Sequence, residues 1–400
     1  MNIVDKFLNY ISFDTQSDAS STTSPSTSKQ LNLANELVKE LHALGVTNAE
    51  VDPYGIVYAS LDANEGGKNL PAIGLIAHMD TASEMSGANV NPRIVSHYDG
   101  GTIQLNEQFS MDPARFPELL NVIGDDLIVT DGTTLLGADD KAGIAIIMDT
   151  LERLLKDNLP HGNVYIAFTP DEEIGRGVAN FDLSRFPADF AYTLDGTDID
   201  SVDYETFNAA QAVVTFQGRS IHPGVAKGRM INAAAAAVHF AASLPQAQRP
   251  EFTEGREGFL HLISMEGECE YARLEYLIRD HDRKLFEQKK ELLKSAAAFT
   301  NTLYEECCHI EITDRYYNMK DYLHGDMEAV DKAKAALESF EVKPTSTPIR
   351  GGTDGAMLTV KGLITPNLGT GGANCHGRYE FVSINKMQKM VDVICKILEG

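Results

Sequence analysis

The chain has 400 residues, enough for two domains, and its hydrophobic content of 43% is ordinary for a globular protein. Asp and Glu number 58 against 34 Lys and Arg, and the resulting net charge of -24 argues against binding to nucleic acid or to an anionic membrane. The 5 cysteines are odd in number and show no CxxC spacing, which argues against a disulfide framework and against a cysteine-only zinc site.

The first half of the chain alternates helices and strands. Short apolar runs predict strands over residues 72–80, 164–170 and 190–196, and amphipathic patterns predict helices over 27–46 and 139–158. This rhythm predicts an α/β domain with a mainly parallel central sheet flanked by helices. Residues 91–131 are richer in Gly, Asn and polar residues, and we expect an inserted hairpin and loops there.

The pattern changes near Phe207. From there a strand, a helix, two strands, a helix and a strand are predicted up to residue 318, an order that fits a ferredoxin-like α/β fold. Residues 348–381 then return to glycine-rich loops and a buried strand, and a closing helix follows Ser383. We therefore expect a large domain of residues 1–206 plus 319–400, with residues 207–318 inserted into it.

Acidic residues and histidines gather where the predicted strands of the large domain end. In open α/β sheets, ligands bind beyond the carboxyl ends of the strands. An acidic pair before a helix is often only a cap, but several such positions without a cluster of Lys or Arg predict a cation site. The positions are His78, Asp80, Asp139, Asp140, Asp171, Glu172, Glu173, Asp195 and His376.

Two histidines and several carboxylates suit zinc, cobalt or manganese. If two metals lie about 3.5–4 Å apart, one carboxylate can bridge them, and a bound water becomes a nucleophile at neutral pH. A spare carboxylate can then act as general base. Asp80 lies two residues after His78, on the same face of a strand, so it is placed to orient the imidazole.

The motifs "AHMDTA", "GADDKAG", "TPDEEIG", "YTLDG", "IHPG" and "CHG" stand in the order found in the dizinc M20 aminoacylase/carboxypeptidase-type peptidases, which this sequence resembles. Intervening segments such as "NVNPRIV", "TEGREGFLHL" and "PIRGGTDGA" bring the resemblance closest to the tripeptide aminopeptidases of that family. The resemblance implies a zinc-peptidase-like catalytic domain and an inserted lid or dimerisation domain. It also implies hydrolysis of the N-terminal peptide bond of tripeptides by a water that bridges two zinc ions, with cobalt or manganese as alternatives.

The resemblance also implies a role for each site residue. Asp139 would bridge the metals, with a cis peptide bond between Asp139 and Asp140. Glu172 would be the general base, and Asp80 would orient His78. The remaining metal ligands would be His78 and Asp195 at one site, and Glu173 and His376 at the other. Asp171 has no implied chemical role, and we expect it to cap the turn after Pro170.

Four residues are candidates for binding substrate. In related dimers the histidine at the position of His222 reaches the partner's active site and can stabilise an oxyanion. Arg279 and Arg350 offer the bidentate fork that binds a substrate carboxylate, and Asn232 is a further candidate. The structural alternatives are a strand-end histidine beside a Pro-Gly turn for His222, and ion pairing with the adjacent aspartates for Arg279.

Two other functions stay open at this point. The chain can be another M20-type metallohydrolase, such as a dipeptidase, a carboxypeptidase or an N-acyl amino acid hydrolase. It can also be a metal-binding protein without catalysis, although the intact Glu172 argues against that. We expect a tripeptide substrate with a free N-terminus and a possible homodimer through the inserted domain. We also expect a cytoplasmic location, because the first residues lack the pattern of a secretory signal and no apolar run is long enough to span a bilayer.

Overall fold

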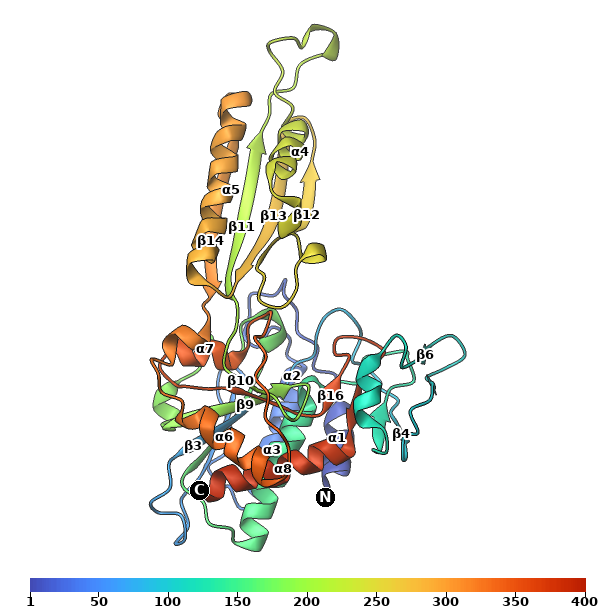
Figure 1. Cartoon of the computed structure of the whole chain (residues 1–400), viewed down its shortest axis with the longest axis vertical. Coiled ribbons are helices and arrows are strands. Elements are labelled where there is room, and N and C mark those ends of the chain that lie inside the picture. The colour runs from blue at the N-terminus through green and yellow to red at the C-terminus, as the bar shows by residue number, and fades with distance from the viewer. The chain divides into compact units, whose positions relative to one another are not determined.

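The computed structural model describes residues 1–400 and divides into two compact units. The large unit comprises Met1–Tyr204, Tyr322–Thr347 and Thr353–Gly400, and the small unit comprises Glu205–Asp321 and Pro348–Gly352. In Figure 1 the small unit carries the strands coloured from yellow-green to orange. No helix in either unit has the length and apolar character needed to cross a membrane.

A seven-stranded sheet forms the centre of the large unit. Its four inner strands, β8 (Val164–Thr169), β3 (Ile73–His78), β9 (Phe190–Gly196) and β15 (Asn367–Gly369), are parallel. Each outer strand pairs in antiparallel fashion with its inner neighbour: β2 (Val57–Leu61) with β8 and β1 (Glu50–Val51) with β2 at one edge, and β10 (Val202–Asp203) with β15 at the other. The predicted α/β fold with a mainly parallel sheet is confirmed, since the parallel strands form its core.

Both faces of this sheet are buried, because side chains that alternate along each strand enter two different cores. On β3, Leu75 and Ala77 join the main core, whereas Ile76 joins a second core with Phe181 and Leu358. The main core also receives side chains from α1 (Ile3–Ile11), α2 (Gln30–Ala43), α3 (Ala138–Asp157), α6 (Glu328–Ser339) and α8 (Ile384–Glu399).

Helix α7 (Asp354–Val360) lies where we predicted only a glycine-rich loop, and that prediction is wrong. The side chain of Thr353 accepts the backbone N–H of Ala356 and so caps the helix. Gly355 lets the helix approach its neighbours, since a Cβ atom there would lie 2.5 Å from the carbonyl oxygen of Thr365. Glycine is therefore needed at position 355 for close packing of a helix and does not indicate a loop.

Residues 91–131 contain the predicted hairpin, β5 (Ile103–Gln104) and β6 (Ser110–Met111). The segment also supplies β4 (Arg93–Val95) and β7 (Leu127–Val129) to a second sheet. That sheet is completed by β16 (Gly372–Ala373) and β17 (Phe381–Ser383) from near the C-terminus. The loop between β16 and β17 carries His376.

The small unit has the element order β11 (Asn208–Gln217), α4 (Ala233–Ser243), β12 (Phe259–Gly267), β13 (Tyr271–Asp280), α5 (Arg283–Leu303) and β14 (Cys308–Tyr316). Its sheet has the order β12-β13-β11-β14 with all neighbours antiparallel. This is the arrangement of a ferredoxin-like fold. Side chains of α4 and α5, including Phe240 and Phe286, pack with Phe216 and Leu274 of the sheet in one core.

Candidate metal centre

The predicted ligands come from five separate segments of the large unit. His78 is the last residue of β3, Asp195 belongs to the end of β9, and Glu173 follows β8 in a short 3-10 turn. Asp139 lies in the first turn of α3, and His376 lies in the loop after β16. The parallel strands thus deliver their terminal residues to one edge of the sheet, as the general rule for open α/β sheets predicts.

Asp139 lies between the two histidines. Its Oδ1 is 2.8 Å from Nε2 of His78, and its Oδ2 is 3.3 Å from Nε2 of His376. A carboxylate whose two oxygens face two different imidazoles has the geometry needed to bridge two cations. The peptide bond between Asp139 and Asp140 is cis, as expected.

One further carboxylate accompanies each histidine. Oδ1 of Asp195 is 3.4 Å from Nε2 of His78, and Oε2 of Glu173 is 3.1 Å from Nε2 of His376. The five predicted ligands therefore fall into two sets that share Asp139.

The donor set fits divalent cations. Donor atoms of His78, Asp139 and Glu173 all lie within 4.8 Å of one another, as do those of His78, Asp140 and Asp195. Oε1 of Glu173 is buried and has no hydrogen-bond partner, an arrangement that a cation would correct.

The pKa shifts at the site are also consistent with bound cations. Burial raises the pKa of Asp195 to about 7 and that of Glu172 well above the usual carboxyl range. Hydrogen bonds to Asp139 and Glu173 raise the pKa of His376 to about 11. Bound cations would favour the charged forms of these buried carboxylates, whose pKa values burial raises.

The outer nitrogens of both imidazoles also have partners. Nδ1 of His78 lies 3.0 Å from the backbone oxygen of Asp80, while the Asp80 carboxylate is 3.5 Å away. Nδ1 of His376 lies 3.6 Å from Oε1 of Glu84, which the sequence did not single out. The 3.0 Å hydrogen bond fixes the orientation of the His78 imidazole, whereas the contact of His376 with Glu84 is longer than a hydrogen bond.

The Asp80 carboxylate makes its own hydrogen bonds to the acidic turn after β8. It accepts the backbone N–H of Glu172 at 2.9 Å and that of Glu173 at 3.2 Å. Asp80 therefore orients His78 through its main chain and holds the Glu172–Glu173 turn through its side chain.

Asp171 does not cap the turn that follows it, so our prediction for this residue is wrong. It adopts a left-handed conformation with φ of 61°, and its carboxylate accepts hydrogen bonds from Ser26 and from the side chain of Gln30. The N–H groups of Glu172 and Glu173 in the turn are bound by Asp80, and Asp171 instead accepts three donors from Ser26 and Gln30.

Three further buried acidic residues lie around the centre: Asp140 was a candidate position from the sequence, whereas Asp354 and Glu380 were missed. Asp140 accepts the backbone N–H groups of His78 and Gly143, each at 3.2 Å. Asp354 accepts the hydroxyl of Thr169 at 2.7 Å, next to the acidic turn. Glu380 accepts backbone N–H groups of the segment that carries Asp139. Only Asp140 stood in a motif beside a predicted ligand; the other two have no local signal that distinguishes them from ordinary surface acids.

The four predicted substrate-binding residues belong to the small unit. Asn232 caps α4 by accepting the backbone N–H of Ala235, and His222 accepts that of Gly224 in the Pro-Gly turn. Their roles in substrate binding stay predictions.

The two arginines of this group are held by main-chain oxygens and aromatic rings. Arg350 donates to the carbonyls of Gly255 and Glu257, both at 2.8 Å, and its guanidinium lies over Phe207. Arg279 donates to the carbonyl of Ile278 at 3.2 Å and lies 5.3 Å from the ring centre of Tyr316. The alternative that Arg279 is ion-paired with Asp280 or Asp282 is wrong: Asp280 pairs with Lys289 at 2.7 Å, and Asp282 caps α5 by accepting the backbone N–H of Leu285 at 2.8 Å.

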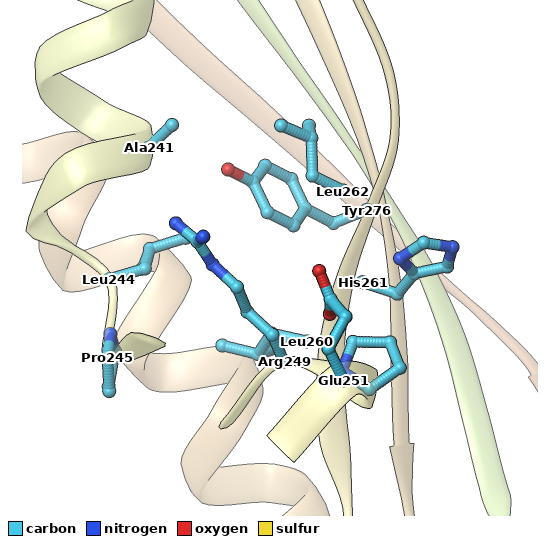
Figure 2. A pocket seen from close by; sticks show the side chains of 10 residues that line it. Ala241, Leu244, Pro245, Arg249, Glu251, Leu260, His261, Leu262 and Tyr276 are labelled. Atoms are coloured by element: carbon cyan, nitrogen blue, oxygen red, sulfur yellow. The ribbon is translucent and has the colours of Figure 1, made fainter. Parts of the chain in front are cut away.

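A pocket of about 220 Å³ opens in the small unit between α4 and the strands β12 and β13. Figure 2 shows Tyr276 and Arg249 among its lining side chains, together with Leu244, Leu260 and Leu262. No predicted metal ligand or substrate-binding residue lines it. The pocket and the acidic cluster are therefore separate features.

Comparisons with known proteins agree with this geometry. The family model described as Peptidase family M20/M25/M40 matches residues 136–400. Peptidase T of Clostridium acetobutylicum is 49% identical over 401 residues, which cover 99% of this chain and 98% of that protein.

Two solved structures share the fold over the whole chain. The aminopeptidase PepT of Bacillus cereus has a TM-score of 0.79 at 23% identity, and the alignment covers 100% of this chain and 97% of that one. A tripeptidase of Staphylococcus aureus has a TM-score of 0.78 at 20% identity, with the same coverage of 100% and 97%.

Proposed function

The chain belongs to peptidase family M20/M25/M40 and is a metal-dependent aminopeptidase, and on that premise we propose that it removes the N-terminal residue of tripeptides with two bound zinc ions. The proposal rests on the position of the Asp139 carboxylate: its Oδ1 faces His78 and its Oδ2 faces His376. The names Peptidase T and tripeptidase among similar proteins support the choice of tripeptides.

We propose that each metal is held by one histidine, one carboxylate and the shared Asp139. His78 with Asp195 would hold one ion, and His376 with Glu173 would hold the other. Cobalt or manganese suits the same donors. When bound, the two cations would polarise the scissile carbonyl and lower the pKa of a water to near neutrality.

Glu172 is proposed as the group that moves the proton. Its neighbour Glu173 is tied to His376 and its backbone N–H is held by Asp80. Its buried carboxyl group is close enough to Asp195 and His78 for their charges to act on its pKa. In this role the carboxylate takes a proton from the attacking water and delivers it to the amine that leaves. A carboxyl whose pKa is raised by burial is suited to that exchange, because it holds the proton between the two steps.

Recognition of the substrate ends is proposed for the small unit. Arg279 and Arg350 would bind the C-terminal carboxylate, His222 would stabilise the oxyanion, and Asn232 would add a polar contact. Because His222 is predicted to act in a partner's site, this proposal includes a homodimer formed through the small unit. We further propose a cytoplasmic location, which the five free cysteines support.

The alternative is another M20-type hydrolase, namely a dipeptidase, a carboxypeptidase or an N-acyl amino acid hydrolase. Turnover of trialanine beside dialanine, tetraalanine and N-acetyl-trialanine, with added zinc and after chelation, separates these activities. We expect trialanine to be cleaved to alanine and dialanine only when metal is present. Turnover of the acetylated peptide at a similar rate would contradict an aminopeptidase, and preference for dialanine would favour a dipeptidase.

A further inference from the structure

Glu380 is a buried carboxylate in the large unit, with a relative exposure of 1%, and it lies four residues after His376. It accepts three backbone hydrogen bonds from one short segment. Its Oε2 accepts the N–H groups of Leu136 and Gly137, both at 2.7 Å, and its Oε1 accepts that of Asp139 at 3.0 Å. Charge-assisted bonds of this kind are among the stronger hydrogen bonds in proteins.

The three donors form the turn that opens α3. An α-helix begins with N–H groups that have no partner within the helix, and a polar side chain at the cap position usually accepts one of them. Here the cap position is Gly137, with φ of +83°, and it has no side chain to accept anything. Glu380 takes over this function from a segment more than 240 residues away, because its two carboxylate oxygens accept the N–H groups at the start of the helix.

Glu380 is also tied to the loop of His376. Its backbone N–H donates to the carbonyl of Gly377 at 3.2 Å, which closes the turn directly after the histidine. Glu380 thus holds both the main chain of Asp139 and the loop of His376. The side chains of these two residues lie 3.3 Å apart, from Oδ2 of Asp139 to Nε2 of His376. Because each contact is to the main chain, a shift of Glu380 would change the distance between Asp139 and His376.

We infer that Glu380 is a positioning residue of the metal centre, which sets the affinity for the cation between His376, Glu173 and Asp139. The inference rests on the proposed function, because it requires that these residues bind metal. Residues that hold metal ligands in place typically change metal affinity by about 10–100-fold when they are replaced.

The test compares the full-length parent protein with Glu380→Gln and Glu380→Asp. Gln keeps the volume but presents an amide N–H₂ to a backbone donor, whereas Asp keeps the charge on a shorter side chain. Asp203→Asn is the matched control, because Asp203 is also a buried carboxylate of the large unit and accepts the backbone N–H of Thr347 at 2.8 Å. Each metal-stripped protein is titrated with Zn²⁺ by calorimetry, and its fold is checked by circular dichroism.

We expect Glu380→Gln to remain folded and to bind one of two zinc ions about 10–100-fold more weakly, with kcat restored by excess zinc. Glu380→Asp should lose less affinity, and Asp203→Asn should bind zinc like the parent. Parent-like zinc affinities in a folded Glu380→Gln would overturn the inference. Failure of both Glu380 variants to fold would also overturn it, since the residue would then serve the stability of the whole unit. If the parent itself binds no zinc, the proposed function fails instead.

Discussion

The carboxylate of Asp171 binds Ser26 twice, accepting its backbone N–H at 2.7 Å and its hydroxyl at 2.5 Å. Gln30 adds a third hydrogen bond from its side-chain amide at 2.7 Å. Asp171 directly precedes Glu172, so the loop before α2 is tied to the turn that carries the proposed general base. The three adjacent acidic residues therefore have different surroundings: Asp171 binds this loop and Glu173 faces His376, while Glu172 between them is the proposed general base.

Asp171→Asn should lower both stability and kcat. Asparagine tolerates the left-handed conformation, but its N–H₂ group would face a donor, so we expect a loss of about 1–3 kcal/mol in unfolding free energy. Because Glu172 is the next residue, kcat should fall more than KM rises. Urea unfolding and steady-state kinetics on trialanine measure both effects.

Thr22→Ala is a control for Asp171→Asn, because Thr22 lies in the same loop, is exposed and makes no hydrogen bond to Ser26 or Asp171. This control should change neither the free energy of unfolding nor kcat. Parent-like kcat in Asp171→Asn would show that the link to Ser26 does not position the base.

Glu172→Gln should stop hydrolysis without loss of metal. The Glu172 side chain is not among the proposed ligands, so the amide leaves the metal donors in place but cannot take up a proton. We expect kcat to fall by about 10²–10⁴-fold while the zinc content stays at that of the parent. Glu173→Gln provides the contrast, since it should lose zinc as well as activity; loss of zinc from Glu172→Gln would refute the assignment of the base.

The two proposed metal ions should leave the protein at different rates. The His376 side chain is 41% exposed and that of His78 is 2% exposed, so a chelator reaches one half of the centre more easily. Release of zinc to a chromophoric chelator should show a fast and a slow phase. In His376→Ala the fast phase should disappear and the slow phase should persist. A single phase in the parent, or loss of the slow phase in the variant, would contradict this asymmetry.

Lys6→Met tests a buried ion pair far from the chemistry. The Lys6 side chain is 1% exposed and its Nζ binds Asp149 at 2.8 Å and Glu152 at 2.5 Å. We expect a loss of about 1–3 kcal/mol, less than for a fully buried pair, because both carboxylates keep some contact with water. Lys39→Met removes a pair on an exposed helix surface and should change stability by less than about 0.5 kcal/mol. Urea unfolding midpoints compare the two variants.

Much of the fold follows from local patterns in the sequence. Continuous apolar runs predicted β3, β8 and β9, because strands buried on both faces need no polar positions. The order of elements in the small unit predicted its ferredoxin-like fold. The helix α7 was missed because its segment is rich in glycine, and its formation depends on the Thr353 cap and on close packing of Gly355.

The candidate site also has one part that could be predicted from the sequence and one part that could not. His78, Asp139, Glu173, Asp195 and His376 were named from motifs, and the structure brings all five together. The roles of Asp171 and Glu380 were out of reach, because their partners lie 145 and more than 240 positions away in the chain. A single acidic residue forms no periodic sequence pattern, so nothing near it in the sequence predicts a contact with a distant main chain.

Short stretches of sequence decide which segments become strands and helices and which residue types are available as ligands, since both depend on local composition. Only the tertiary structure decided which oxygen of Asp139 faces which histidine, and which carboxylates hold the ligand-bearing turns. These contacts exist because packing of the sheet and its helices brings together main-chain donors and side-chain acceptors that are remote in sequence. A buried N–H group must find an acceptor wherever the fold provides one, and here Glu380 and Asp80 provide it.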